Sequence, residues 1–282
     1  MIFEHEIPEG SKLYFGGAAR TKREIERIAS ELLFQQGYEE IVTPLFSYHQ
    51  HQSISDQREL VRVNDSDNHR MSLRADSTID VVRIIDKRLG RNTSHKKWFY
   101  IQPVYRFPSC EQYQIGAEHI GEKNLAGILN DIFKVFKNLE IQPTLQLSNI
   151  RIPQKIAQML DIDLADFRTI NVEKFLNKNI DWLTKLVYIH TPEDIDVAME
   201  AAPREIQEEL QKLKELCADV AYENIVIAPL YYAKMLYYDE LFFRVIEKND
   251  VYARGGRYKN DALVSVGFAI YTDALIEKLS KD

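Results

Sequence analysis

The sequence predicts an α+β fold in which an antiparallel sheet is flanked by helices. Residues 19–36, 76–89 and 125–140 carry apolar side chains at helical spacing. Between them lie runs of β-branched and aromatic residues joined by short polar turns, which is typical of antiparallel strands. The order of helix, strands, helix and hairpins lacks the regular strand–helix alternation of a doubly wound fold.

The composition fits a globular chain and argues against several classes of protein. The chain has 282 residues, of which 45% are hydrophobic, enough for one large domain or one domain with an insertion. The net charge of −7 lowers the expectation of a nucleic-acid-binding surface. No apolar run reaches the roughly 18 residues of a membrane span, and the N-terminus lacks the apolar core of a signal peptide.

The two cysteines, Cys110 and Cys217, lie far apart and show no spacing typical of a metal site. We therefore expect two reduced thiols in a cytoplasmic protein. The sequence also lacks a Walker loop, a dinucleotide fingerprint and a nucleophile elbow. It thus predicts no metal and no cofactor.

The first elements follow from local signals. Thr21 and Glu24 fit a capping box near the start of the helix at 19–36, and Gly37 ends it. In the strand expected at 38–46, Pro44 restricts that strand to a sheet edge or an interface. Further strands are expected at 58–63, 69–74, 97–107, 112–119 and 144–150.

The second half of the chain changes character. Residues 151–221 are rich in Lys, Glu, Asp and Gln at helical spacing, which predicts a mainly helical insertion into a core formed by 1–150 and 222–282. Strands are expected again at 224–230, 236–246 and 250–256, and residues 262–279 read as a strand that runs into a final helix. Within that strand, Gly267 and Ala269 share one side and leave room beside it.

Two segments place polar residues on a common face by alternate spacing. In the strand at 112–119, Gln114 and Glu118 point to the same side, and Arg106 lies upstream. In "LRADST", residues 73–78, the same spacing groups Arg74, Asp76 and Thr78.

Together these two segments offer two carboxylates, guanidinium groups, an amide and a hydroxyl. A small zwitterion requires this set, because its ammonium needs carboxylate acceptors and its carboxylate needs a guanidinium. Leaving one such buried charge unpaired costs roughly 3 to 5 kcal/mol. The spacing alone fits a structural salt-bridge network and a ligand site equally well.

In this order, the segments resemble the motifs of a class II aminoacyl-tRNA synthetase catalytic domain of the histidyl type. The similarity spans 1–150 and 222–282, with the insertion in the expected place. The matching segments are "GYEEIVTPLF" for motif 1, "FYIQPVYRF" with "YQIGAEHIG" for motif 2, "LRADST" for the amino-group stretch, "MLYYDELFF" and "GGRY" for the two histidine signatures, and "VGFAIYTDAL" for motif 3.

The resemblance implies a histidine pocket. Its residues would be Asp76, Thr78, the motif 2 residue Arg106, the Gln-x-x-x-Glu pair Gln114 and Glu118, and the tyrosine pair Tyr237 and Tyr238. Asp76 departs from the family, which has a glutamate there. Adjacent strand tyrosines point to opposite faces, so one ring can line a pocket while the other packs in the core.

The groups that serve ATP in the synthetases are missing. Ala233 and Ala274 stand where the family has arginines at the α- and γ-phosphates, and Leu236 replaces the aspartate of Leu-Asp-Tyr-Tyr. Pro108 replaces the motif 2 acid, and the loop after it is short. Because positioned cations stabilise the charge of phosphoryl chemistry, and one lost donor costs roughly 10² to 10³ in rate, we expect no catalytic residues.

The chain also ends after the motif 3 helix, so we expect no anticodon-binding domain and no tRNA partner. These features together resemble the regulatory subunits of ATP phosphoribosyltransferase. The resemblance implies a non-catalytic subunit that forms homodimers within a hetero-oligomer with the short-form catalytic subunit. It further implies a role in activity and in histidine feedback on the first step of histidine biosynthesis.

Two alternatives remain open. One is an active histidyl-tRNA synthetase-like or amino-acid-activating ligase, which Ala233 and Ala274 oppose. The other is a scaffold that assembles the transferase without binding histidine.

Overall fold

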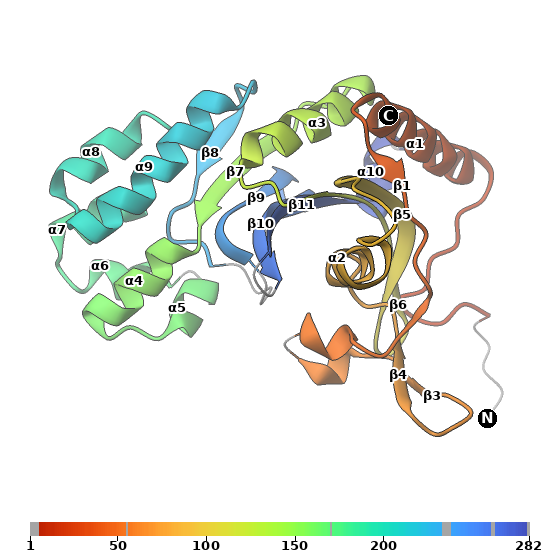
Figure 1. Ribbon diagram of the computed structural model, residues 1–282. Helices are drawn as coiled ribbons and strands as arrows, with labels where there is room; N and C mark the ends of the chain where they lie inside the picture. The colour runs from red at the N-terminus through yellow and green to blue at the C-terminus, as the bar shows by residue number, and fades with distance from the viewer. Residues whose placement is uncertain (1–5, 55, 170, 233–237, 261–262, 281–282) are drawn as a thin grey trace. The chain divides into compact units, whose positions relative to one another are not determined.

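The computed structural model describes residues 6–54, 56–169, 171–232, 238–260 and 263–280. The described residues of 6–121 and 260–280 form one compact unit, and those of 122–232 and 238–259 form a second. Figure 1 shows the elements of both units. The predicted division into a core and a separate insertion at 151–221 stays a prediction.

The first unit begins with helix α1 (Gly16–Gln35), which buries Ile25, Ala29 and Leu33. Gly37 follows it with a φ of +80°, the left-handed conformation that favours glycine after a helix. The predicted capping box is wrong, because the helix starts at Gly16, and Glu24 instead accepts hydrogen bonds from Arg27.

The larger sheet of the first unit has the strand order β1-β5-β6-β11. The strands are β1 (Glu39–Glu40), β5 (Lys97–Arg106), β6 (Cys110–Ile120) and β11 (Leu263–Tyr271). The pairs β5–β6 and β6–β11 are antiparallel as predicted, whereas β1 runs parallel to β5. Helix α10 (Thr272–Leu279) follows β11 and packs against α1 and β6.

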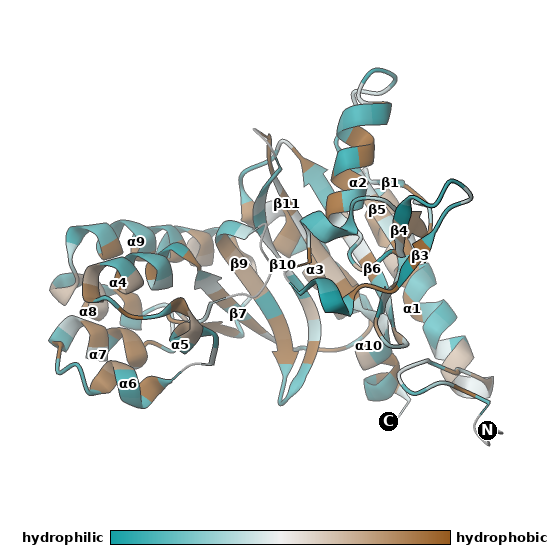
Figure 2. Ribbon diagram, turned by 90° about the horizontal axis from the view of Figure 1, so that it is seen from below, coloured by the Kyte–Doolittle hydropathy of each residue, from teal (hydrophilic) through white to brown (hydrophobic). Residues whose placement is uncertain are grey.

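A small sheet of the order β2-β4-β3 lies between β1 and α2 in the sequence. Its strands are β2 (Phe46–Ser47), β3 (Arg62–Asn64) and β4 (Arg70–Leu73), with short 3-10 turns at Gln50–Gln52 and Gln57–Glu59. Figure 2 shows that the β3–β4 hairpin is largely hydrophilic. Helix α2 (Thr78–Ile84) then continues into one π turn, Ile85–Leu89.

The second unit combines strands of the order β10-β9-β7-β8 with helices. The strands are β7 (Thr144–Asn149), β8 (Ile225–Ile227), β9 (Tyr238–Glu247) and β10 (Asp250–Asn260), of which β7 and β8 are parallel. The helices are α3 (Leu125–Asn138), α4 (Arg151–Leu160), α5 (Leu164–Thr169), α6 (Val172–Leu176), α7 (Asp181–Val187), α8 (Asp194–Ala201) and α9 (Arg204–Asp219).

Helix α9 packs against β7, α3 and α4, and buries Ile206, Leu210 and Leu213. The helices of the predicted helical stretch, 151–221, therefore pack against one another through apolar side chains and also pack against the strands of their unit.

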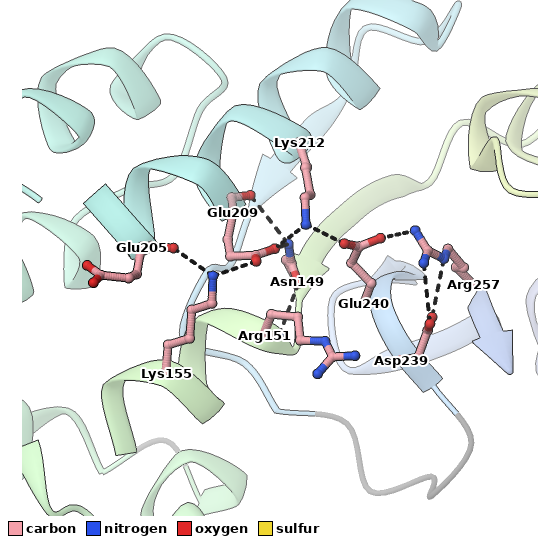
Figure 3. A network of polar contacts seen from close by, with 9 residues as sticks. All are labelled: Asn149, Arg151, Lys155, Glu205, Glu209, Lys212, Asp239, Glu240 and Arg257. Atoms are coloured by element: carbon pink, nitrogen blue, oxygen red, sulfur yellow. Dashed lines mark hydrogen bonds and ion pairs between the residues drawn. The ribbon is translucent and has the colours of Figure 1, made fainter. Parts of the chain in front are cut away.

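A polar network adds to this attachment (Figure 3). The carboxylate of Glu209, on α9, accepts hydrogen bonds from Lys155 at 2.7 Å, from Lys212 at 2.9 Å and from the amide of Asn149 at 2.9 Å. Burial would raise the pKa of Glu209, but these hydrogen bonds outweigh it and hold the pKa below its ordinary value.

The network continues into the strands of the same unit. Lys212 also donates to Glu240 on β9, and Arg257 on β10 donates to the other oxygen of Glu240. Arg257 is also paired with Asp239, its Nε lying 3.4 Å from Oδ1. Helix α9 is thereby joined to β9 and β10 by alternating charges.

Candidate functional site

The polar face of the first unit is formed by alternate residues of β5, β6 and β11. Glu118 on β6 is the register partner of Gly267 on β11. Gly116, two residues before Glu118 on β6, pairs with Tyr100 on β5. Gln114, two residues earlier still, lies on the same side of the strand. The predicted alternation of this strand is confirmed.

The carboxylate of Glu118 is completely buried within this face. The hydroxyl of Tyr100 donates a hydrogen bond to Glu118 Oε1 at 3.3 Å and lies 3.4 Å from the hydroxyl of Thr78. Burial, followed by the charge of Glu118, raises the pKa of Tyr100 well above its ordinary value, so the phenol stays protonated. Thr78 and Glu118 therefore both lie beside the hydroxyl of Tyr100.

Two glycines create the space for these side chains. A Cβ atom at Gly116 would lie 2.1 Å from the ring of Tyr100. A Cβ atom at Gly267 would lie 1.8 Å from Glu118 Oε2. The prediction that Gly267 leaves room beside its strand is confirmed, and the space is filled by a carboxylate.

The loop that carries Asp76 is held by the side chain of Gln50, which is 1% exposed. Gln50 Oε1 accepts hydrogen bonds from the backbone N–H groups of Ala75 at 2.8 Å and Asp76 at 2.7 Å. Its Nε2 donates to the carbonyl of Asp76 at 2.9 Å and to the carboxylate of Asp80. All the polar groups of one amide are therefore used to fix this loop.

Asp76 lies at the start of α2, where its Oδ1 accepts a hydrogen bond from the backbone N–H of Ile79 at 3.1 Å. The strand spacing predicted for 73–78 is wrong, because β4 ends at Leu73. Arg74 consequently does not join Asp76 and Thr78. It is 4% exposed and donates to the carbonyls of Pro103 at 2.9 Å and Thr43 at 3.0 Å.

Gln114 and Arg106 lie progressively further from Glu118 along the β5–β6 hairpin. Gln114 donates to the side chain of Gln112 at 3.0 Å. Arg106 pairs with Cys110 at the hairpin end, a position eight steps along β6 from Glu118, which corresponds to about 26 Å of extended strand. Arg106 Nε lies 3.7 Å from Glu59, and its Nη1 is buried without a hydrogen-bond partner among the described residues.

Of the predicted tyrosine pair, Tyr237 and Tyr238, the structure describes only Tyr238. Tyr237 lies outside the described residues, as do Ala233 and Leu236. Tyr238 is the first residue of β9 in the second unit, and its ring stacks against Phe242 with 5.8 Å between the ring centres.

The segment that resembles motif 3 carries a carboxylate at the start of α10. Asp273 accepts hydrogen bonds from the hydroxyl of Tyr14 at 2.5 Å and from the backbone N–H of Tyr113 at 2.9 Å. Burial raises the pKa of Asp273. Asp273 therefore attaches the N-terminal segment to β6 and α10, and Ala274 beside it offers no cation.

No local sequence pattern indicated Tyr100 or Gln50. Tyr100 sits in a run of aromatic residues, and only the strand register shows that it lies opposite a glycine. Gln50 acts on a loop 26 residues away, for which no local spacing exists. No group of three metal-ligating side chains occurs in the part of the chain that the structure describes.

The chain is similar to proteins of one family over nearly its whole length. An ATP phosphoribosyltransferase regulatory subunit of Wolinella succinogenes is 47% identical over 279 residues, which cover 99% of this chain and 97% of that protein. The protein of the same name in Helicobacter hepaticus is 42% identical, covering 99% of each chain. The chain belongs to the ATP phosphoribosyltransferase regulatory subunit family.

Two further similarities concern the fold of this regulatory subunit. The histidyl-tRNA synthetase family model matches residues 16–275. A crystal structure described as an ATP phosphoribosyltransferase regulatory subunit/histidyl-tRNA synthetase from Bacillus halodurans superposes with a TM-score of 0.86 at 18% identity, covering 99% of this chain and 84% of that chain. The predicted class II aminoacyl-tRNA synthetase-like α+β fold is confirmed.

Proposed function

We propose that this chain is the non-catalytic partner of a short-form ATP phosphoribosyltransferase catalytic subunit, and that it binds histidine on the polar face of its first unit. The observation that carries the proposal is the completely buried carboxylate of Glu118, which accepts a hydrogen bond from Tyr100 and fills the space beside Gly267. The names of the two bacterial relatives support the partner.

Histidine carries groups that complement this face. Its ammonium and its imidazole N–H groups are donors for the carboxylates of Glu118 and Asp76, and its ring can accept from or donate to Gln114. Its carboxylate is an acceptor for a guanidinium. Arg106 remains a proposed contact by resemblance alone, because a single histidine is too short to span the length of strand between its position and Glu118. Tyr237 and Tyr238 remain proposed contacts by resemblance alone.

Calorimetric titration with histidine tests the pocket. Glu118→Gln keeps the shape of the side chain but removes its charge, and should weaken histidine binding at least tenfold, since hydrogen bonds to charged groups contribute roughly 1.5 to 3 kcal/mol. Asp86→Asn removes one negative charge from an exposed position of the same unit and is the matched control. Equal histidine affinity in both variants would reject this pocket and favour a scaffold that does not bind histidine.

Co-purification with the catalytic transferase tests the partner. The complex should show transferase activity that histidine lowers, and the isolated catalytic subunit should be less active. The alternative of an amino-acid-activating ligase has its own assay, since it predicts histidine-dependent exchange of pyrophosphate into ATP. We expect none, because Ala274 removes a cation that the family uses at the γ-phosphate.

A homodimer within this hetero-oligomer would use the segment around Pro44. Val42, Leu45 and Phe46 expose 81%, 37% and 51% of their surface in one short stretch. An apolar cluster of this kind is typical of an interface with another chain. We place the complex in the cytoplasm, and among the described residues no helix is both long and apolar enough to cross a bilayer.

A further inference from the structure

A cavity of about 350 Å³ opens on the small sheet of the first unit. Its lining includes Arg62, Arg70, Ser72, His51, Tyr48 and Gln57. None of these residues belongs to the proposed histidine pocket. The volume is at the lower end of the range for small-molecule sites.

Strand register places the cationic groups of this cavity on one face. Ser72, on the central strand β4, pairs with Ser47 on β2 and with Arg62 on β3. These three residues therefore form one row across the sheet. Arg70 precedes Ser72 by two residues on β4, so it points to the same side and is the diagonal neighbour of Arg62. Two guanidinium groups consequently converge on the cavity.

The two arginines have no carboxylate partner among the described residues. The side chain of Arg62 donates a hydrogen bond to the backbone carbonyl of Gln57 at 3.0 Å, and the side chain of Arg70 forms neither a hydrogen bond nor an ion pair with a described residue.

Three of the neighbouring acids are already paired with other groups. Asp65 accepts hydrogen bonds from Tyr48 and His69, Asp56 pairs with Arg58, and Glu59 lies beside Arg106. Like charges on neighbouring strands destabilise a sheet, and a bound anion would remove this cost.

We propose that this cavity binds a small phosphate-bearing metabolite, with the phosphate held by Arg62 and Arg70. A phosphate monoester carries close to two negative charges near neutral pH and three terminal oxygens, which matches two guanidiniums better than a single carboxylate does. The hydroxyl of Ser72, in the same row as Arg62, is available as a further donor to a phosphate oxygen. The remaining volume accommodates a small organic group.

Binding of inorganic phosphate to the full chain tests the site, measured by calorimetry at constant ionic strength. Arg62→Gln and Arg70→Gln should each weaken phosphate binding at least tenfold, and the double variant should abolish it. Arg91→Gln removes the same charge from an exposed position of the first unit and should bind phosphate like the unmodified chain. A sugar phosphate should bind more tightly than inorganic phosphate, because its organic group fills the cavity.

Phosphate affinity that stays within threefold in the double variant would overturn the proposal, as would an equal loss in Arg91→Gln. All three substituted residues are exposed and lie in a hairpin or loop, and circular dichroism verifies that each variant is folded. The double variant should bind histidine with unchanged affinity, so that failure of the phosphate site is distinguishable from failure of the proposed histidine pocket.

Discussion

Substituting Gly267 by alanine tests whether the buried carboxylate of Glu118 serves a ligand. The added Cβ would lie 1.8 Å from Glu118 Oε2, 2.7 Å from its Cδ and 2.9 Å from the carbonyl oxygen of Ala117. Contacts below 3.0 Å require movement, and the backbone carbonyl of Ala117 is constrained by the β6–β11 register. The Glu118 carboxylate must therefore leave its position.

Two losses follow from this displacement. Overpacking of a well-packed interior costs about 1 to 3 kcal/mol of stability. Movement of the carboxylate also breaks its hydrogen bond with Tyr100 and misaligns it with any bound cation or N–H donor. Because hydrogen bonds to charged groups contribute roughly 1.5 to 3 kcal/mol, histidine binding should weaken by roughly 10- to 150-fold.

The assay combines urea unfolding with calorimetric titration of histidine. Gly17→Ala is the matched control, because Gly17 lies in α1 and an added Cβ would meet no described atom within 4 Å outside its chain neighbours and the backbone of its own helix. That control should leave histidine affinity unchanged and stability equal or slightly raised. A folded Gly267→Ala chain that binds histidine as tightly as the Gly17→Ala chain would refute the assignment of Glu118 to the pocket.

Three further predictions concern stability and assembly. Gln50→Ala should lower the free energy of unfolding by about 3 kcal/mol in urea titration, because buried backbone groups of the Asp76 loop lose their partner; an effect below about 0.5 kcal/mol would contradict that role. Glu209→Gln should lower it by about 2 kcal/mol at pH 7. Because the pKa of Glu209 is lowered on folding, its stabilisation is present above about pH 4.5 and is lost as the pH falls through the folded pKa, so the difference between the two chains should shrink in acid. Val42→Glu should shift the chain toward monomer in sedimentation velocity if the exposed stretch forms a dimer interface; an unchanged mass would exclude this segment.

Periodicity predicted the elements well where one face of a strand or helix is buried. The alternation of Gln114, Gly116 and Glu118 was sufficient to place them on one face of β6, because side chains along a strand point to opposite faces in turn. It failed at 73–78, where polar residues at alternate positions belong to a strand end and a helix start. Arg74 was consequently grouped with Asp76, although its side chain holds backbone carbonyls instead.

The parts of the site that the sequence could not predict depend on contacts between distant segments. The parallel pairing of β1 with β5 joins residues about 60 positions apart, and no hairpin turn signals it. The role of Tyr100 depends on the register that places it opposite Gly116. The resemblance to the histidyl enzymes predicted Glu118 as a pocket residue, but its complete burial is evident only in the folded chain.

The chain of alternating charges from Lys155 to Asp239 has a mechanical consequence for the second unit. Glu209 and Glu240 each form ion pairs with two basic residues, so sliding α9 along the strands would break several ion pairs at once. Helix α9 and strand β9 are therefore expected to move together as one rigid element. A displacement of α9 should therefore be accompanied by a displacement of β9, which begins at Tyr238.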